Sequence, residues 1–457
     1  MNLAFRTDTP RANGRARFIF RIGRLLVAMG LFAVVLCQGN GISIKKSVSV
    51  MAIQPPAGQQ TATGEELPQE IRKPVTINAQ NYPSLQAAFD AVSQNGGLLT
   101  IPAGDYVITE PLVVHGSEVR IVGRGPATRI INHNTEGKPA IIVRPADRET
   151  NPRARLWRVE FAYLRIQGDP KAIDAKSTEP TSGPGLVAEG VNEILLHALS
   201  IDHNGGHGIA LIDCYEDPRI CDCIITYNRG AGIFLKACHD IVVNANQLEE
   251  NQQALVCIDS FNLCMNGNNL DDHLGEGIII ENTYGSVISG NMIEECQGPA
   301  IVLDRDCYGI TLSANVLADN FGGAIDLRDA WGCTVSANTF TIDPVFAVRI
   351  GPNSGRITIT GNNFSDSYIG QQTRRTDKAN LATGIVLEGT TDIVISGNIF
   401  TGLADPAVTA RGGCRRLAIT GNIIRDVAQS RAEDRKALDL GDATDVVLAN
   451  NILPEAQ

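Results

Sequence analysis

The stretch from Gly277 to Ala300 reads GIIIENTYGSVISGNMIEECQGPA, and it is one copy of a unit that recurs through the second half of the chain. An asparagine in a short frame of the type VISGN marks each copy, in most cases 22 to 24 residues after the one before. The marked positions are Asn246, Asn268, Asn291, Asn315, Asn338, Asn362, Asn398, Asn422 and Asn450. A repeat of this length predicts a solenoid, because each unit is too short to bury its apolar side alone and must stack on its neighbours.

Each unit contains three short apolar segments with period-two alternation. In the first segment the second and fourth places are apolar in all seven aligned copies: GIIIE, AIVLD, AIDLR, AVRIG, GIVLE, AVTAR and ALDLG. Such alternation is typical of a strand with one buried face. A second strand precedes the asparagine, and a third apolar site lies two residues after it. With no helical period between them, these segments predict an all-β parallel β-helix with rungs of about 22–24 residues.

The charge of the chain argues against one class of partner. The formal net charge is −11, and removal of residues 1–39 would leave −16. A nucleic acid is therefore not expected as a partner, because it would need a basic surface.

The cysteines follow the repeat. Of the eleven in the chain, several fall eight residues before the asparagine, at a place where other copies have serine, threonine or alanine. A place that accepts only small residues predicts buried free thiols. Cys221 and Cys223 form a C-x-C pair near Cys214, so a local disulfide or a metal site there is the alternative.

The N-terminus has the pattern of an export signal. Six arginines in residues 1–24 precede the apolar run Leu25–Cys37, which is short for a membrane span. Residues 1–39 are therefore interpreted as a signal peptide, with an uncleaved signal anchor as the alternative. Residues 40–75 are interpreted as a flexible linker. The expected location is secreted, periplasmic or cell-surface, or membrane-anchored if the segment is retained.

A short amphipathic helix is expected before the first rung. Ser84 can cap it, and Leu85, Ala88, Phe89 and Val92 share one face. Such a helix would cover the open apolar end of the solenoid. Residues 76–132 are therefore assigned to the cap and first rungs, and residues 133–457 to the remaining rungs, with loop insertions near 144–182 and 366–382.

This cap resembles that of the pectate-lyase-like right-handed parallel β-helix proteins, whose first segment often has an SLQ-A-D-A helix followed by GG-L-IP-G-Y. The matching residues are Ser84, Leu85, Gln86, Ala88, Asp90, Ala91, Gly96, Gly97, Ile101, Pro102, Gly104 and Tyr106. With the repeats, the resemblance covers residues 76–457 and implies a right-handed helix. It implies no single activity, since the fold carries lyases, epimerases, hydrolases and non-catalytic binders. The chain has Asp217-Pro218-Arg219 where alginate epimerases of this fold have an aspartate-proline-histidine tripeptide.

Outward positions provide the candidate site. Neighbouring rungs lie about 4.8 Å apart, so charges in one column would face an extended polymer together. The richest predicted patch comprises Glu281, Asp304, Asp326, Arg328 and Arg349. The alternative is a solvated ladder of ion pairs with no ligand.

Two chemistries fit these residue types. In a lyase acting on a uronic acid polymer, Arg328 or Arg349, or a calcium ion held by Asp304 and Asp326, would neutralise the sugar carboxylate. Lys236 or one of the arginines would then remove the proton from the ring carbon.

A glycosidase would instead use two carboxylates. Glu281 and Asp304, one rung apart, suit a retaining enzyme, whereas Glu281 and Asp326, two rungs apart, suit an inverting one. A separate candidate is the segment 201–208, IDHNGGHG, whose His203 and His207 can act as acid or base near neutral pH.

The expected function is that of an exported protein that binds an extended anionic polysaccharide, and that would cleave it if it is a lyase or glycoside hydrolase. The rival is a non-catalytic surface or adhesion rod, and the sequence leaves open whether the chain is an enzyme. No cofactor is required, with calcium as the one alternative. A monomer or homotrimer is expected, with no nucleic acid partner and no membrane contact beyond the N-terminal segment.

Overall fold

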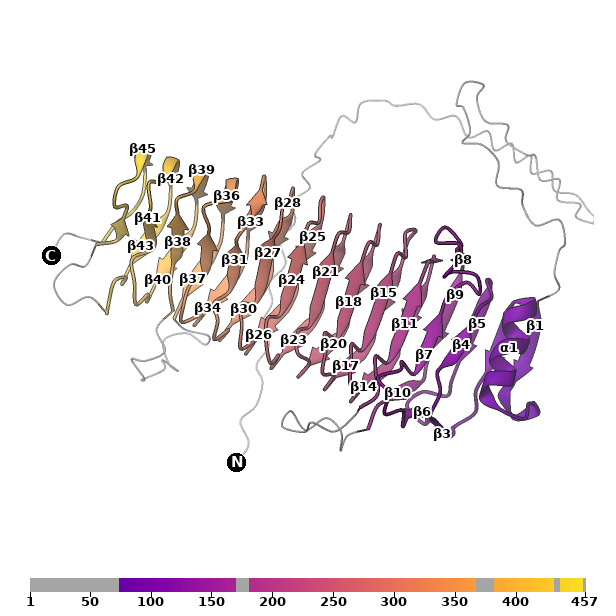
Figure 1. The fold of residues 1–457 in the computed structure, drawn as a ribbon. Coiled ribbons are helices and arrows are strands. Elements are labelled where there is room, and N and C mark those ends of the chain that lie inside the picture. The colour runs from indigo at the N-terminus through magenta and orange to yellow at the C-terminus, as the bar shows by residue number, and fades with distance from the viewer. Residues whose placement is uncertain (1–73, 170–180, 367–381, 431–435, 455–457) are drawn as a thin grey trace, which may run out of the picture. The chain divides into compact units, whose positions relative to one another are not determined.

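A computed structural model of the protein describes residues 74–169, 181–366, 382–430 and 436–454. They form a stack of rungs, each with one strand from three parallel sheets (Figure 1). The chain divides into Met1–Leu67 and Pro68–Gln457, and all described residues belong to the second unit. The predicted export segment, most of the predicted linker, residues 170–180 of the first predicted insertion and residues 367–381 of the second lie outside the described residues.

Sheet C contains the first strand of each repeat and has thirteen strands. They are β4 (Leu112–Val114), β7 (Ile141–Val143), β11 (Leu186–Glu189), β15 (Ile209–Ile212), β18 (Ile233–Lys236), β21 (Leu255–Ile258), β24 (Ile278–Glu281), β27 (Ile301–Asp304), β31 (Ile325–Leu327), β35 (Val348–Ile350), β38 (Ile385–Glu388), β41 (Val408–Arg411) and β44 (Leu438–Asp439).

Sheet A contains the strand before the asparagine, and at some rungs a short strand at the preceding corner joins it, giving 17 strands. They are β1 (Val75–Asn78), β2 (Gly97–Thr100), β5 (Val119–Val122), β9 (Val159–Ala162), β13 (Leu195–His197), β16 (Arg219–Cys221), β19 (Val242–Asn244), β22 (Cys264–Asn266), β25 (Val287–Ser289), β28 (Cys307–Tyr308), β29 (Thr311–Ser313), β32 (Ala330–Trp331), β33 (Thr334–Ser336), β36 (Gly355–Thr360), β39 (Thr391–Ser396), β42 (Arg415–Thr420) and β45 (Thr444–Ala449).

Sheet B contains the strand after the asparagine and also has thirteen strands. They are β3 (Gly104–Ile108), β6 (Thr128–Asn132), β10 (Arg165–Gln167), β14 (Ser200–Asp202), β17 (Ile224–Thr226), β20 (Gln247–Glu249), β23 (Asn269–Asp271), β26 (Met292–Glu294), β30 (Val316–Ala318), β34 (Thr339–Thr341), β37 (Asn363–Ser365), β40 (Ile399–Thr401) and β43 (Ile423–Arg425). A small extra pair joins β8 (Leu156–Trp157) to β12 (Val191–Asn192).

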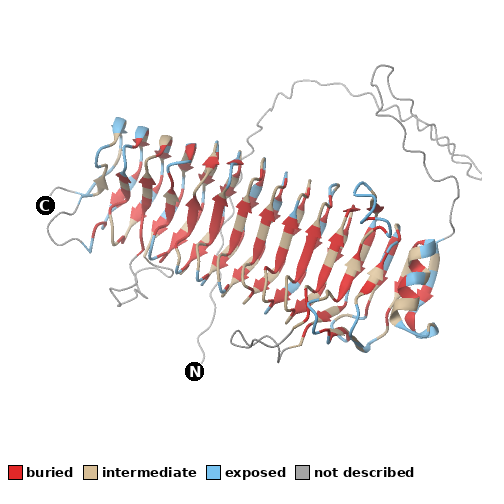
Figure 2. Ribbon diagram, viewed as in Figure 1, coloured by how far each residue is buried: buried red, intermediate tan, exposed pale blue. Residues whose placement is uncertain are grey.

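The core is the apolar interior that these sheets enclose (Figure 2). Inward side chains stack on the same side chain one rung away, as Phe340, Phe364 and Phe400 do with ring centroids 4.6 and 4.5 Å apart. Thirteen strands at about 4.8 Å make the stack roughly 60 Å long. The predicted all-β parallel β-helix is thereby confirmed.

The asparagines form a buried ladder along one corner. From Asn246 to Asn451, the side-chain amide of each ladder asparagine donates to the side-chain oxygen of the next at 2.9–3.1 Å. The ladder residues themselves do not have positive φ, so asparagine does not serve here as the left-handed residue of the bend. The residue before each one carries the positive φ, for example Gly290 at 67°.

This register corrects one predicted position. In the last rung Asn422 donates to Asn451, at 2.9 Å, and Asn450 occupies the left-handed place with φ 55°. The frame there reads VLANN, so the first asparagine matches the glycine of VISGN and the second matches its asparagine.

The N-terminal helix α1 (Leu85–Asn95) follows a single 3-10 turn, η1 (Ala79–Asn81), and has the predicted capping residue. The Ser84 hydroxyl accepts from the Ala87 N–H at 3.1 Å. Phe89 is fully buried and packs against Phe161, with ring centroids 6.5 Å apart. Because Phe89 packs on the core, the helix covers this end of it. Burial of one such ring contributes about 2 kcal/mol. Within the described residues, no helix has both the length and the apolarity to cross a bilayer.

The small buried column eight residues before the asparagines is confirmed. Its members Cys238, Ser260, Thr283, Cys307, Ala330, Ser354, Thr390 and Cys414 are all buried. All ten cysteines that the structure describes are free thiols, including the C-x-C pair. The eleventh, Cys37, lies outside the described residues. Thiols here fill space beside backbone carbonyls rather than cross-link the rungs.

Candidate functional site

A buried carboxylate, Asp326, lies at the centre of the predicted patch. It occupies the outward place of β31, in register with Val302 of β27 and Arg349 of β35. Its side chain is only 1% exposed, and two guanidinium groups bind it. Arg328 Nε donates to Oδ2 at 2.7 Å, while Arg349 Nε donates to Oδ1 at 2.9 Å and its Nη2 to Oδ2 at 2.5 Å. Both carboxylate oxygens are therefore occupied.

The two arginines remain partly open to solvent, with side chains 41% and 35% exposed for Arg328 and Arg349. Hydrogen bonding to Asp326 raises the pKa of Arg349, whose guanidinium also lies 4.5 Å from the ring centroid of Phe346. Each guanidinium has five N–H donors, so each retains donors that Asp326 does not use. The arrangement holds two fixed cations on adjacent rungs with N–H groups available to an anion.

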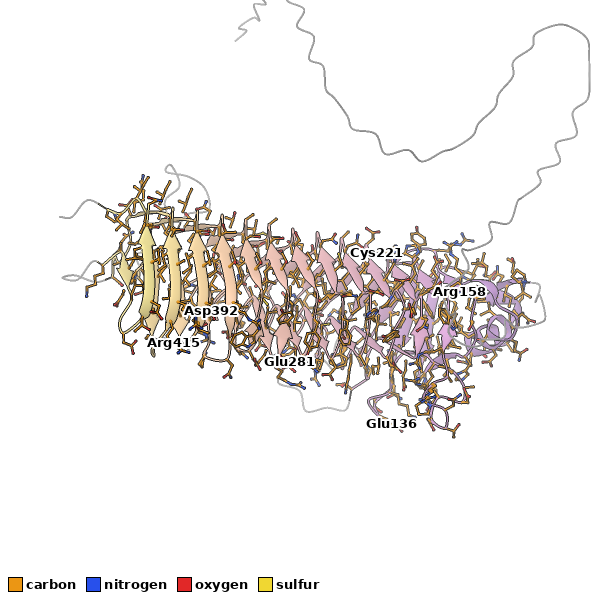
Figure 3. The ribbon with its side chains drawn as sticks, turned by 90° about the horizontal axis from the view of Figure 1, so that it is seen from above. Glu136, Arg158, Cys221, Glu281, Asp392 and Arg415 are labelled. Atoms are coloured by element: carbon orange, nitrogen blue, oxygen red, sulfur yellow. The ribbon has the colours of Figure 1, made fainter. Side chains whose placement is uncertain are left out.

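The other two predicted residues continue this line. Glu281 and Asp304 are in register at the ends of β24 and β27. Arg305 Nη1 donates to Glu281 Oε2 at 2.5 Å, and this bond raises the pKa of Arg305. Arg328 Nη1 lies 3.8 Å from Asp304 Oδ2. Figure 3 shows Glu281 along the stack between Arg158 toward one end and Asp392 and Arg415 toward the other.

Sheet C thus brings all five predicted residues onto four successive rungs, β24 to β35. Every carboxylate among them has an arginine partner: Glu281 has Arg305, Asp304 has Arg328, and Asp326 has two. The predicted alternative of a ladder of ion pairs therefore describes the carboxylates well. The arginines are different, because their charge is held in place while part of their surface stays open.

Three predicted roles fit this geometry poorly. A calcium ion needs six to eight oxygen ligands, whereas both oxygens of Asp326 already accept from arginines. In addition, the described residues contain no group of three or more His, Cys, Asp or Glu side chains placed to hold a metal. An inverting pair of Glu281 and Asp326 would require Asp326 to be accessible. Lys236 lies four rungs from Arg328 along the fifth-place column, about 19 Å away, too far to share a sugar residue with it.

The histidine segment 201–208 does not form one cluster. Asp202 accepts two hydrogen bonds from Arg165 at 2.7 Å and lies 2.8 Å from His203 Nδ1, and the His203 ring stacks on Tyr227. His207 lies four residues on and contacts Phe234 of sheet C instead, with ring centroids 4.6 Å apart.

The two histidines also differ in their surroundings. His207 Nδ1 accepts from the Ala231 N–H at 3.0 Å, and burial lowers the pKa of this imidazole. The His203 ring is held between a carboxylate and a tyrosine at the corner after sheet B. Each ring therefore has a local packing partner, and neither lies on the rungs that carry Arg328.

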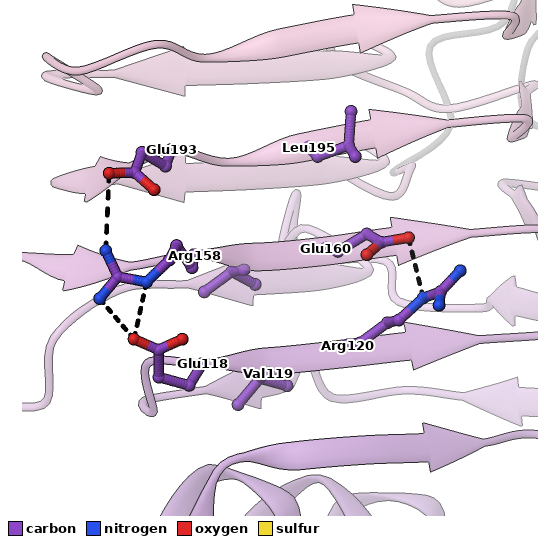
Figure 4. Close-up of a pocket in the computed structure, with 8 residues that line it drawn as sticks. Glu118, Val119, Arg120, Arg158, Glu160, Glu193 and Leu195 are labelled. Atoms are coloured by element: carbon purple, nitrogen blue, oxygen red, sulfur yellow. Dashed lines mark hydrogen bonds and ion pairs between the residues drawn. The ribbon is translucent and has the colours of Figure 1, made fainter. Parts of the chain in front are cut away.

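A hollow that the sequence did not indicate lies on sheet A near the N-terminal end (Figure 4). It has a volume of about 240 Å³ between β5, β9 and β13. Arg158 pairs with Glu118 and, at 3.5 Å, with Glu193 along one side, while Arg120 pairs with Glu160 at 2.9 Å on the other. The hollow is smaller than typical ligand pockets of about 300–1,000 Å³, and its charges satisfy one another.

A sequence signal for this hollow does exist. One side consists of Glu118, Arg158 and Glu193, which all have positive φ and stand two residues before the outward place of sheet A. The same left-handed place recurs on later rungs, often as Gly, Asp or Asn. Alignment from the asparagine could not find these three residues, because they precede the first ladder asparagine.

Comparison with a family model supports the fold. Residues 184–340 and, overlapping them, residues 256–364 match a model described as a right handed beta helix region. No curated protein matches the chain.

Several solved structures are similar. DFA-IIIase from Arthrobacter chlorophenolicus A6 in complex with GF2 is 12% identical with a TM-score of 0.55, covering 71% of this chain and 94% of that chain. The A-module of mannuronan C-5 epimerase AlgE6 from Azotobacter vinelandii is 15% identical with a TM-score of 0.55, covering 83% and 100%. PfbA, a surface adhesin of Streptococcus pneumoniae, is 12% identical with a TM-score of 0.49, covering 73% and 92%. The first two structures, at such identities, show the fold alone, and this fold is the right-handed parallel β-helix.

Proposed function

We propose that this protein binds an extended anionic polysaccharide along the outer face of sheet C, with Arg328 and Arg349 contacting the sugar carboxylates. The observation that carries the proposal is that Asp326 fixes both guanidinium groups while about a third or more of each side chain remains exposed. A fixed guanidinium loses little further freedom when a carboxylate binds it. The repeat of rungs along the axis also suits a ligand whose carboxylates repeat along a chain.

The comparison supports the choice of the first ligand to test. The A-module named a mannuronan C-5 epimerase has the same fold, and mannuronan is a uronic acid polymer. Since fold alone does not determine function, the two arginines are the reason to expect an anionic glycan.

The test is a binding titration with alginate and polygalacturonate on the parent protein and on Arg328→Ala and Arg349→Ala. Each variant should weaken binding about tenfold or more, because a charge-assisted contact contributes about 1.5–3 kcal/mol. Arg416→Ala is the matched control, since Arg416 is an exposed arginine on sheet A that pairs with Asp392. Equal affinity of all four proteins would refute the proposal.

Cleavage by a retaining glycosidase mechanism is the second candidate. Its support is the register of Glu281 and Asp304, which places two outward carboxylates one rung apart. A lyase is less well supported, because an arginine guanidinium does not lose its proton at ordinary pH and so cannot act as a base. Glu281→Gln and Asp304→Asn should each abolish the release of new reducing ends while leaving binding intact; release by both variants would exclude this role.

A non-catalytic adhesion rod remains the rival from another class. Its outer columns would be only solvated ion pairs, so it would neither bind a glycan at these arginines nor release product from any polymer.

We further propose that the protein is exported, on the basis of the arginine-rich flank and the apolar run Leu25–Cys37. Fractionation of producing cells should find the protein outside the cytoplasm. Replacement of residues 25–37 by polar residues should keep the protein inside the cytoplasm.

A further inference from the structure

A single file of rings follows the corner between sheets C and A. Its members occupy the same place on six successive rungs: Tyr215, His239, Phe261, Tyr284, Tyr308 and Trp331. From His239 onward, each member pairs with the next through its backbone. We call these six residues the aromatic rail. Aromatic residues make up only 5% of the chain, so their concentration in one outward column is not a consequence of composition.

Three of the six rings are exposed to solvent, and the other three are partly buried. Tyr215, Phe261 and Tyr308 are 47%, 41% and 47% exposed. Large rings left in water forgo the stabilisation of burial, and exposed apolar surface of this kind is typical of interaction sites. The rail therefore needs an explanation beyond packing.

The spacing of the rings distinguishes the rail from a core stack. The buried rings of Phe340, Phe364 and Phe400 lie nearly parallel, with interplanar angles of 2° and 6°. In the rail, Tyr215 and His239 are also nearly parallel, with centroids 4.9 Å apart at 8°, but Phe261 lies 5.8 Å from His239 at 54° and 5.6 Å from Tyr284 at 22°. Because Phe261 lies farther from both of its neighbours, part of its ring faces is not covered by a neighbouring ring.

The rail borders the proposed binding face. Tyr284, Tyr308 and Trp331 follow Glu281, Asp304 and Arg328 by three or four residues on the same rungs. Polar groups accompany the rings there. The Tyr284 hydroxyl donates to Asp306 at 2.9 Å, and the Arg356 guanidinium lies 5.8 and 5.2 Å from the ring centroids of Tyr308 and Trp331.

We infer that the aromatic rail is a stacking surface for a polysaccharide laid along the helix axis. A sugar ring has an apolar face of C–H groups with hydroxyls at its rim, so it can stack on an aromatic ring while the rim bonds to neighbouring polar groups. The rail spans five steps of about 4.8 Å, roughly 24 Å, which accommodates several sugar residues. A protein partner would need about 800 Å² of surface, whereas a file one ring wide suits a thin polymer.

This inference rests on the proposed function for the direction of the polymer, but it adds a contact that does not require charge. A polysaccharide held by the rail would be recognised partly by its apolar sugar faces. Neutral polymers should therefore bind too, although more weakly than uronic acid polymers that also reach Arg328 and Arg349.

The chain supplies its own reporter for the test. It contains two tryptophans, Trp157 and Trp331, so Trp157→Phe leaves Trp331 in the rail as the one source of tryptophan fluorescence. Titration of this variant with alginate, polygalacturonate, a glucan and a mannan should give a saturable change in emission with at least one polymer. No change with any of the four polymers would overturn the inference.

Rail variants separate this contact from the arginine site. In the Trp157→Phe background, Phe261→Ala and Tyr308→Ala should each weaken binding about fivefold, while Val394→Ala, an exposed apolar residue of sheet A, should not. Unchanged affinity in both rail variants together with loss in Arg328→Ala would overturn the rail and keep the proposed function. Loss in the rail variants with none in Arg328→Ala or Arg349→Ala would keep the rail and refute the arginine site.

Discussion

Alanine at Asn362 should destabilise the stack strongly, whereas alanine at Asn363 should hardly affect it. The Asn362 side chain is 2% exposed and makes four hydrogen bonds. Its amide donates to the Val335 carbonyl and to Asn398 Oδ1, both at 3.0 Å. Its oxygen accepts from the backbone N–H and the side-chain amide of Asn338, at 2.9 and 3.0 Å. Asn363, the first residue of β37, is exposed.

The magnitude follows from the groups left without a partner. Alanine at Asn362 orphans two donors of Asn338 and removes one bond from the Val335 carbonyl, while Asn398 Oδ1 keeps its bond from the Asn362 backbone N–H at 2.9 Å. Each buried orphan costs about 1–3 kcal/mol. Allowing for partial relaxation, the expected loss is about 3–5 kcal/mol. Alanine at Asn363 removes no ladder bond and should change stability by less than about 0.5 kcal/mol.

The measurement is urea unfolding of both variants and the parent, followed by circular dichroism, with native-state hydrogen exchange at the Asn338 N–H. The Asn362→Ala variant should unfold at lower urea and exchange faster at Asn338, and Asn363→Ala should match the parent in both. Equal midpoints for the two variants, or unchanged exchange at Asn338, would refute the ladder as a source of stability.

Three further outcomes follow from buried groups. Burial raises the pKa of Asp343, whose Oδ1 accepts from Asn320 while its Oδ2 is buried without a partner. The stability that depends on this carboxyl is therefore present at low pH and lost as pH rises. Asp343→Asn should raise the melting temperature more at pH 8 than at pH 4. Burial lowers the pKa of His273 from 6.5 to about 4. The stability that depends on the neutral ring is therefore present above pH 6.5 and lost as pH falls toward 4, by roughly 3 kcal/mol. His273→Asn should remove this dependence of the unfolding free energy on pH in acid unfolding curves. Iodoacetamide at pH 8 should label the exposed Cys264 but not Cys307 of the buried column, whose pKa burial raises to about 12; labelling of Cys307 in the native protein, measured by mass spectrometry, would show that the column is open.

The repeat could be predicted from local chemistry alone. Inward places accept only apolar residues whatever rung they are on, so alternation around Gly277–Asp304 was enough to define strands and core. The cap was equally local, because Ser84 and one apolar face specify a helix end and its buried side. The prediction failed at Asn450, where two adjacent asparagines fit the frame and only the ladder bond from Asn422 to Asn451 distinguishes them.

The site could be predicted only as a column of residue types. That Glu281, Asp304, Asp326, Arg328 and Arg349 share an outward face follows from the period. Which of them is buried, and which arginine each carboxylate binds, depends on side-chain conformations across rungs that are about 23 residues apart in sequence.

The sequence by itself therefore determined the period, the inward and outward places and the cap, because each of these depends on the environment of one residue at a time. The tertiary structure decided that Asp326 holds two arginines, that the two histidines of segment 201–208 have separate partners, and that six rings form one rail. An outward side chain meets its partners on neighbouring rungs, and the choice among those partners is made by geometry that no single repeat contains.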